Sequence, residues 1–441
     1  MPGLGVLVAS ALGSPTALPS RAASRLQRQS KSIANLVLRA SVQANMVYTW
    51  SMDHQALSAS PIGTVVPISG TDPLNGRAFE HFAYTPAPLP SEASLRSATW
   101  NTVVAAEAAL GRLDQAAQQF PQPALLRRPA LRREAQSTSA LEGTYAPFET
   151  VLASEPEDRP GLPVEVREVL NYVVAAEEGF AWVADRPITV GLIERLQGVL
   201  VANTPGERYD AGTVRSRQVF IGSRGLPIEE SRFVPPPPGA QLRASIGDWI
   251  EWIKSPPKDL SPVVRAAMAH YQFETLHPFY DGNGRIGRLL IALSLMSDGI
   301  LREPILVVSP WFEARRSAYQ DGLLNLSMTG AWDDWISFFA TGVAEAADTT
   351  RHRVERLLDW REQSLERVRA AGVSGVAERV AGELIGSPIT RAPVIARKHD
   401  ITQQGAMLAL RRLVELGVLQ EERFGGRVSF VANEALALLR I

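Results

Sequence analysis

The sequence predicts a mainly α-helical protein with a small β-hairpin in its core and a winged helix-turn-helix at its C-terminus. Three observations predict this class. Apolar residues recur at helical spacing through most of the chain. A single β-like run, residues 217–221, lies among turn-forming residues. Near the C-terminus, two short helical patterns precede two alternating segments that flank a Gly-Gly turn.

Composition limits the number of domains and the classes of function that are possible. A chain of 441 residues is long enough for two or three domains, and 45% hydrophobic residues are ample for burial. Lys and Arg number 45 against 46 Asp and Glu, so the formal charge of −1 does not indicate a nucleic-acid protein. The absence of cysteine excludes disulfides, thiol catalysis and Cys-ligated zinc. No run of about 18 apolar residues occurs, so we expect no membrane span and a cytoplasmic location.

We expect five regions along the chain. They are a poorly ordered N-terminal extension (1–75), an N-terminal helical region (76–160), a catalytic core (161–345), a linker helix (346–372) and a winged helix-turn-helix (373–441). The extension has no acidic residue before Asp53 but several arginines, a composition similar to that of a transit peptide. We favour the alternative, an unstructured extension that precedes a start near Met46 or Met52.

The N-terminal half contains a series of amphipathic helical patterns. Prolines 121 and 123 separate the first two patterns, and Gly143 ends the second, as glycine commonly ends a helix. The predicted helices span 93–119, 131–141, 164–178 and 190–201. Residues 211–238 differ in character and predict a hairpin, which four consecutive prolines close.

Helical patterning returns at residue 242 and continues to residue 363. We expect Trp332 and Trp335 in the core and the charged run 351–369 on a solvated helix. Beyond it, helices are predicted over 391–399 and 402–416, and strands over 418–421 and 427–431. This order of elements indicates the winged helix-turn-helix.

The most informative segment for chemistry is 277–288, His-Pro-Phe-Tyr-Asp-Gly-Asn-Gly-Arg-Ile-Gly-Arg. A helix is expected to end just before it, and an apolar helix to begin near Arg285. The Gly-Asn-Gly turn between them lets the backbone approach a ligand closely. Several N–H groups would then point to one spot at the positive end of the second helix. Such a spot is suited to phosphate.

Charged side chains on the same segment complete a reaction site. Arg285 and Arg288 are three residues apart, so both can bind phosphate oxygens from one helix face. Asp281 offers a hard oxygen ligand suited to Mg²⁺. His277 is an ionisable base near neutral pH. One loop therefore supplies a proton acceptor, a metal ligand and a phosphate cradle.

This segment resembles the signature of the Fic (fido) family, His-Pro-Phe-x-Asp-Gly-Asn-Gly-Arg-x-x-Arg, at every position. The resemblance implies a protein adenylyltransferase. In that family the histidine, here His277, deprotonates a Ser, Thr or Tyr hydroxyl of a target protein. The hydroxyl attacks the α-phosphate of ATP and pyrophosphate leaves. The resemblance assigns Mg²⁺ to Asp281 and the phosphates of ATP to Gly282, Asn283, Gly284, Arg285, Gly287 and Arg288.

A second resemblance concerns residues 212–222, which are similar to the family's flap hairpin. There an extended strand aligns the target by strand addition. The residues that would dock the target are Val219, Phe220, Ile221 and Gly222. The alternative is an ordinary surface hairpin.

The third resemblance is to the family's inhibitory motif, over residues 138–143. A hydroxyl residue, Thr138, is followed four residues later by Glu142. In relatives that carry the motif, the glutamate pairs with the second signature arginine, here Arg288, and takes the place of the γ-phosphate. Arginine and carboxylate form a strong directional pair. The alternative is a plain helix end with a solvent-facing glutamate.

Some positions depart from the family pattern or have simpler explanations. Gln197 stands where many relatives have histidine. Trp311 and Tyr319-Gln320 occupy a region where relatives often have tyrosines near the nucleobase, which leaves the preference for ATP open. His270 is seven residues before His277 and could form a metal pair, but we favour a core position because no third ligand is suitably spaced.

Alternatives to this function stay open at the level of the sequence. The chain could be a nucleotide-sensing DNA-binding regulator, or a Fic enzyme that uses another nucleotide or removes AMP. The intact signature favours the adenylyltransferase. The expected partners are a target protein with an exposed hydroxyl and DNA at the winged helix, and a homodimer stays open.

Overall fold

Helices dominate the structure, a computed structural model that describes residues 52–71, 76–120, 122–154, 161–222, 227–424 and 427–440. Residues 53–441 form one compact unit, to which every element below belongs. Within the described ranges, no helix is both long enough and apolar enough to cross a bilayer. The expected extension over residues 1–51, the turn at 223–226 and the Gly-Gly turn at 425–426 lie outside the described residues.

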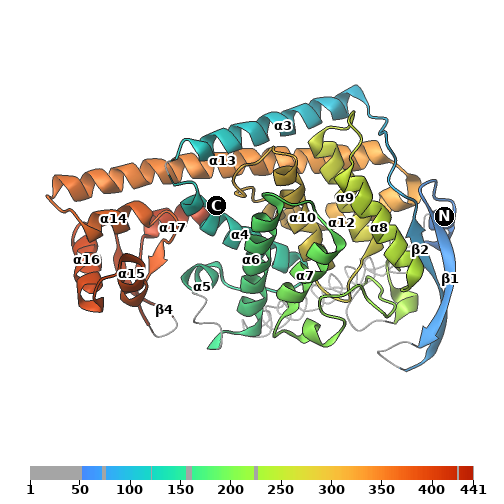
Figure 1. The fold of residues 1–441 in the computed structure, drawn as a ribbon, viewed down its shortest axis with the longest axis horizontal. Helices are drawn as coiled ribbons and strands as arrows, with labels where there is room; N and C mark the ends of the chain where they lie inside the picture. Colours follow the sequence, from blue (N-terminus) through green and yellow to red (C-terminus); the bar gives the residue numbers. More distant parts are fainter. Residues whose placement is uncertain are drawn as a thin grey trace, which may run out of the picture. The chain divides into compact units, whose positions relative to one another are not determined.

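The centre of the fold is a bundle of helices around the signature segment. The helices expected over 164–178 and 190–201 are α6 (Val164–Val183) and α7 (Val190–Val201). They pack together and bury apolar side chains against α9 (Pro262–Leu276) and α10 (Asn283–Ser297). The bundle also includes α4 (Ala124–Leu141), α5 (Phe148–Ala153) and α8 (Ala240–Lys254). Figure 1 shows α6, α7 and α10 beside one another.

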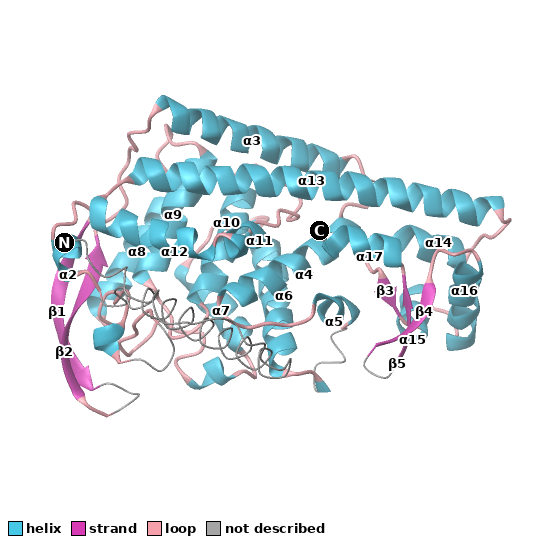
Figure 2. Cartoon of the chain, turned by 180° about the vertical axis from the view of Figure 1, so that it is seen from behind, coloured by secondary structure: helices cyan, strands magenta, loops and turns pink. Residues whose placement is uncertain are grey.

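Two long helices lie side by side along the bundle, α3 (Ser97–Gln118) and α13 (Trp332–Ala370) (Figures 1 and 2). The expected core position of Trp335 is confirmed, since it is 2% exposed, whereas Trp332 is only partly buried. The run 351–369 is helical, but one of its faces buries Val354, Leu357 and Trp360. Because α13 is continuous, no helix ends at the boundary expected near residue 346.

Shorter helices connect these elements. They are α2 (His54–Ser58), α11 (Ser309–Ala314), α12 (Arg316–Thr329) and the 3₁₀ turns η2 (Pro205–Arg208) and η3 (Ile228–Glu230). The helix expected from residue 131 begins earlier, at Ala124, and contains Pro129. Proline usually ends a helix because it lacks an N–H and clashes with the preceding turn. The predicted helix was therefore started after Pro129, which is too late.

The N-terminal part of the described chain is ordered where we expected an extension. Residues 63–71 form β1 (Gly63–Thr71), which pairs antiparallel with β2 (Ala78–Pro86). The expectation of poor order up to residue 75 was wrong for this segment. The many small residues suggested a loose segment, but β1 belongs to a two-stranded sheet. Pro67 is accommodated there because proline, which lacks an N–H, is tolerated in an edge strand.

The segment expected to form the flap hairpin is extended but not a regular ladder. A single antiparallel bridge joins Ile221 and Phe233. Next to this bridge, a side chain takes the place of strand pairing. The side-chain amide of Gln218 donates hydrogen bonds to the main-chain carbonyls of Val219 (2.8 Å) and Pro235 (2.9 Å). The main-chain N–H of Tyr84 in β2 donates to the Val234 carbonyl at 2.8 Å. The flap segment is therefore tied to the unexpected hairpin.

The C-terminal elements follow the expected order of helix, turn, helix and hairpin. The helices are α15 (Ala392–His399) and α16 (Gln403–Glu415), and the strands are β4 (Gln420–Phe424) and β5 (Arg427–Val431). A short strand, β3 (Ile389–Thr390), gives a sheet of order β3-β5-β4. Helices α14 (Val376–Glu383) and α17 (Asn433–Arg440) pack on α13. The assignment as a winged helix-turn-helix stays a prediction.

Candidate active site

The signature segment is a tight loop between α9 and α10. His277 ends α9 in the left-handed conformation, with φ 49°. Gly282, with φ 86°, precedes the first residue of α10. This conformation is rare for residues with a side chain but easy for glycine. The two turns place the imidazole and the first turn of α10 on the same short stretch of chain.

The imidazole of His277 is half-buried and set up to accept a proton. Its Nδ1 lies 3.2 Å from the carbonyl oxygen of Glu274. A carbonyl only accepts, so Nδ1 carries the hydrogen and Nε2 keeps its lone pair. Burial, and then the positive charge of Arg215, lower the pKa of His277 to about 4. The ring is therefore neutral at physiological pH.

At the first turn of α10, where we expect the phosphate cradle, one side chain departs from the expectation. Asn283 does not aim its amide outward, because the amide accepts from the Phe279 N–H (2.8 Å) and donates to the Phe279 carbonyl (2.7 Å). Its side chain therefore shapes the loop. We expected it to hold phosphate, but the structure shows both of its polar atoms engaged. The turn nevertheless leaves no room for a side chain at Gly284, where a Cβ would lie 2.1 Å from Oε1 of Glu142.

Glu142 reaches this turn from the end of α4. Its Oε1 accepts a hydrogen bond from the Arg288 guanidinium at 2.6 Å. Arg288 also donates to the hydroxyl and the carbonyl of Thr138, at 2.6 Å and 3.1 Å. Burial alone would lower the pKa of Arg288, but the charges of Glu142 and its neighbours raise it above the usual value. The structure thus places Thr138, Glu142 and Gly284 beside Arg288. Of these contacts, the family resemblance implied the one between Glu142 and Arg288.

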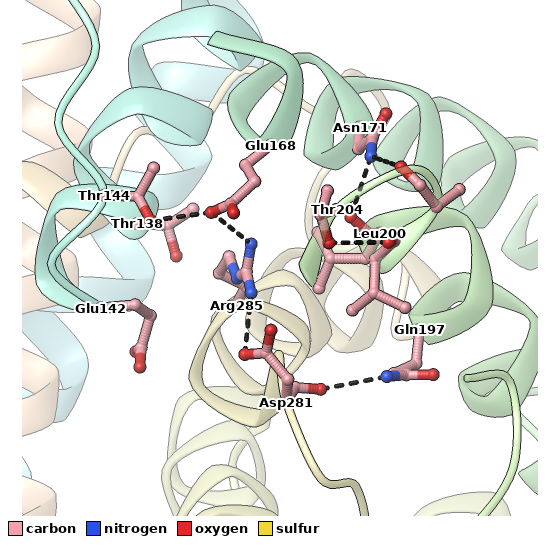
Figure 3. A network of polar contacts seen from close by, with 12 residues as sticks. Thr138, Glu142, Thr144, Glu168, Asn171, Gln197, Leu200, Thr204, Asp281 and Arg285 are labelled. Carbon is pink, nitrogen blue, oxygen red and sulfur yellow. Dashed lines mark hydrogen bonds and ion pairs between the residues drawn. The ribbon is translucent and has the colours of Figure 1, made fainter. Parts of the chain in front are cut away.

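The first signature arginine has different partners (Figure 3). The Arg285 guanidinium donates to Oδ1 of Asp281 at 3.1 Å and lies 3.6 Å from Oε2 of Glu168 on α6. Glu168 in turn accepts from the hydroxyl of Thr144 at 2.8 Å. Although Arg285 is 3% exposed, its Nε has no hydrogen-bond partner among the described residues. The sequence did not indicate Glu168 or Thr144, because nothing in a linear pattern places α6 beside this loop.

Asp281 is more open than its neighbours, with 43% of its side chain exposed. One carboxylate oxygen contacts Arg285, and the backbone of Gly206 approaches the other so closely that a Cβ there would lie 2.3 Å from Oδ2. Within the described ranges, no cluster of three or more His, Cys, Asp or Glu could hold a metal unaided. A Mg²⁺ ion bound through one carboxylate and nucleotide oxygens fits this donor set.

Two further buried residues support the loop from α7 and the chain that follows it. The Gln197 side chain is fully buried, donates to the Asp281 carbonyl (3.1 Å) and accepts from the Gly212 N–H (2.6 Å). Arg215 is 1% exposed and donates to the His277 carbonyl at 2.8 Å. In the sequence, Gln197 was noted only as a departure from the family pattern, and Arg215 only as part of the segment that resembles the flap.

The predicted docking residues lie on the same connecting segment. Val219 is buried, Phe220 and Ile221 are partly buried, and Gly222 is exposed. The N–H of Ile221 donates to Phe233 (2.8 Å), which fixes one edge of this stretch. Ile221 also accepts from the N–H groups of Arg232 and Phe233.

The remaining sequence candidates belong to the core. His270 is 2% exposed and bonds the Gly287 carbonyl (3.0 Å) and the Tyr319 hydroxyl (2.8 Å). Both ring nitrogens are therefore engaged, and His270 lies in the core, the position that we favoured over a metal site. Tyr319 is itself 4% exposed, and Trp311 packs against Phe338. A nucleobase contact from Tyr319 is therefore not supported.

Comparisons with known proteins agree with this geometry. Residues 100–181 match a model described as Fic/DOC family N-terminal, and residues 187–295 match a model described as Fic/DOC family. The protein adenylyltransferase fic-1 of Caenorhabditis briggsae is 36% identical over 91 residues, which are 20% of this chain and 16% of the relative. The protein adenylyltransferase Fic of Nematostella vectensis is 35% identical over 132 residues, 30% of this chain and 27% of the relative.

The matched segments are short parts of these relatives. This chain covers between 16% and 27% of the length of the curated relatives compared. A crystal structure of a Fic family protein from Desulfovibrio desulfuricans G20 aligns with 78% of this chain and 98% of its own, with 19% identity and a TM-score of 0.48. At that score the overlap carries no argument about function.

Proposed function

We propose that this chain, which belongs to the Fic/DOC family through residues 100–181 and 187–295, is a protein adenylyltransferase that moves AMP from ATP to a hydroxyl of a protein. The observation that carries the proposal is the placement of a neutral imidazole, His277, beside the first turn of α10. A base and an anion cradle on one loop are what phosphoryl transfer to a hydroxyl requires. The reaction consumes ATP, so we expect it in the cytoplasm.

His277 acts as the general base. Its Nε2 accepts the proton of a Ser, Thr or Tyr hydroxyl as the oxygen attacks the α-phosphorus. The bond to the bridging oxygen breaks and pyrophosphate leaves with the electron pair. The contact between Nδ1 and the Glu274 carbonyl holds the tautomer that leaves Nε2 free. The target is a protein that presents an exposed hydroxyl residue along Val219, Phe220, Ile221 and Gly222.

The phosphates are held by the first turn of α10. Its N–H groups and the close approach allowed at Gly284 favour anions, whereas a Cβ at Gly282 or Gly287 would meet Leu200 or Glu274. Arg285 and Arg288 add charge-assisted hydrogen bonds. Mg²⁺, when bound at Asp281, would offset negative charge on the phosphates.

Glu142 makes the resting enzyme self-inhibited. Its carboxylate lies over Gly284 and pairs with Arg288, the place that an incoming phosphate group needs. Because two anions cannot share one guanidinium and one helix turn without mutual repulsion, productive ATP binding requires Glu142 to leave. Thr138 holds the same guanidinium and stabilises the closed arrangement.

Labelled ATP tests the proposed reaction directly. The Glu142→Gly protein is incubated with ATP labelled at the α-phosphate and, separately, at the γ-phosphate. Only the α-label should become attached to protein, and the Glu142→Gly/His277→Ala double variant should remain unlabelled. Attachment of the γ-label would identify a kinase instead. The same assay with GTP, CTP and UTP identifies the nucleotide.

For the C-terminal elements we propose DNA as the partner. Helix α16 exposes Arg411 and Arg412 on the face that a recognition helix would present to phosphates. Arg412 is partly neutralised by Glu415 at 2.7 Å, and Leu408 on the same helix is 63% exposed. An exposed leucine also suits a protein partner, so the binding test described below includes that outcome.

A further inference from the structure

Arg215 is a buried cation whose guanidinium pairs with no carboxylate in the described part of the chain. Its side chain lies between the end of α9 and the flap segment and is 1% exposed. Among the described residues its guanidinium contacts only main-chain carbonyls. Burying a charge without an opposite charge is costly, and burial lowers the pKa of Arg215 to about 10. The side chain still stays charged at neutral pH, so the fold must gain something from this arrangement.

The guanidinium joins three separate pieces of chain. It donates to the His277 carbonyl at 2.8 Å and to the Leu276 carbonyl at 3.5 Å. It also donates to the carbonyl of Arg217 at 3.2 Å, where the flap segment begins, and to that of Pro236 at 2.5 Å, where it returns. Its own main-chain N–H donates to the Pro278 carbonyl at 2.9 Å.

These contacts surround the strained residue of the loop. His277 has a left-handed backbone, which a residue with a side chain adopts at a cost. The carbonyls on either side of that strain, those of Leu276 and Pro278, are both held by Arg215. The base therefore cannot relax its backbone without breaking contacts to the segment that is proposed to dock the target.

We propose that Arg215 is a positioning residue that locks the base His277 and the docking strand into one rigid unit. The proposal rests on the proposed function and adds a residue to it. The target hydroxyl is placed by Val219–Gly222, and the proton acceptor is placed by the loop. A single side chain that bonds both sets their separation. Misplacement by about 1 Å can cost about a hundredfold in rate.

Arginine is the side chain that the geometry requires. The planar fork offers five donors in fixed directions and no acceptor, which matches a ring of carbonyls. Lysine would keep the charge but could not reach the four carbonyls at once. Glutamine would lose the charge and present only two donors. Comparing the two substitutions therefore separates the effect of the guanidinium geometry from the effect of its positive charge.

The charge has a second effect on the base. The charged groups that face His277 are Arg215 from the flap side, Glu142 from the end of α4 and Asp281 from its own loop. Arg215 opposes protonation of the ring, whereas the two carboxylates favour it. Loss of the cation should raise the pKa of His277 from about 4 toward its ordinary value, about 6.5.

The test uses the full chain with two readouts. In the Glu142→Gly background, Arg215→Gln should lower kcat for AMP transfer about a hundredfold while KM for ATP stays within about twofold, because the phosphate cradle does not contact Arg215. Arg215→Lys should lower kcat but keep the pH dependence of the parent. Thermal unfolding shows whether each variant is folded; if Arg215→Gln is not, Arg215→Lys carries the test.

The second readout does not need catalysis. The imidazole of His277 is titrated by NMR, with its signal assigned by comparison with His277→Ala. Arg215→Gln should raise the pKa of His277, and the control Arg217→Gln, which removes an exposed charge two residues away, should not. Unchanged kcat together with an unchanged pKa in Arg215→Gln would overturn the proposal. If Glu142→Gly itself transfers no AMP, the proposed function fails, and the titration still tests Arg215.

Discussion

The carboxylate of Glu142 and the guanidinium of Arg288 lie 2.6 Å apart, although 146 residues separate them in the chain. The pair spans the end of α4 and the first turns of α10. The Arg288 side chain is 2% exposed and the Glu142 side chain 38%, so water screens the pair from the glutamate side only. This contact is the basis of the proposed self-inhibition.

Removing the carboxylate should activate the enzyme. We expect Glu142→Gly to raise self-modification with α-labelled ATP about ten- to a hundredfold, because a charge-assisted pair is worth roughly 1.5–3 kcal/mol. Glu142→Gln keeps the size but not the charge and should give an intermediate rate. Equal, high activity in the wild type and both variants would mean that residues 138–143 are only a helix end.

The base should be essential for transfer and dispensable for nucleotide binding. Removal of a general base typically costs about a hundred- to ten-thousandfold. We therefore expect His277→Ala, in the Glu142→Gly background, to lose transfer while calorimetry shows nearly unchanged ATP affinity. The cradle on α10 does not use the imidazole. A double variant that transfers AMP at the parent rate would remove His277 from the mechanism.

The pH dependence should report Glu274 rather than His277. His277 is neutral above a pKa of about 4, so its ionisation does not limit the rate near neutrality. Burial raises the pKa of Glu274 to about 7. Above that pH, Glu274 becomes negative close to Arg288 and should weaken ATP binding. We expect KM for ATP to rise from about pH 6 to 8, and Glu274→Gln to remove the rise. A rise that persists in Glu274→Gln would point to another group.

Gly284 should be needed for nucleotide binding because of space. A Cβ at this position would lie 2.9 Å from both terminal nitrogens of Arg288, where the phosphate is proposed to sit. We expect Gly284→Ala to weaken ATP binding tenfold or more even without Glu142, on the order of 1.4 kcal/mol. Gly247→Ala in α8 is the matched control, since a Cβ there meets no atom within 4 Å. Restored affinity in Gly284→Ala/Glu142→Gly would show that only Glu142 was displaced.

The C-terminal elements should bind DNA through α16. We expect the full chain to shift duplex DNA at low salt, with affinity that falls as salt rises. Arg411→Ala should weaken binding for every sequence tested, because a phosphate contact carries no sequence information. Leu408→Ala is the contrasting variant, because it removes an exposed apolar side chain and no charge. No shift of DNA at low salt would favour a protein partner.

The local elements and the signature chemistry could be predicted from the sequence because their information is contiguous. Helical periodicity predicted α6 and α7. The short segment 277–288 contains the proposed base, the proposed metal ligand and both arginines. The resemblance to a family motif also anticipated the distant partner of Arg288. Residues 63–71 were misjudged because their many small residues suggested a loose segment, whereas β1 exists through its pairing with β2, which a local pattern does not show.

Only the tertiary structure decided which side chains meet. It turned the Asn283 amide onto Phe279, placed Glu168 beside Arg285, and set Arg215 among the carbonyls of two distant segments. A sequence pattern reports which residues share a face, but the partner across that face depends on how helices pack and on which buried polar groups must be satisfied. The residues of the loop were therefore determined locally, whereas the proposed inhibition and the proposed alignment with a target depend on contacts that only the folded chain creates.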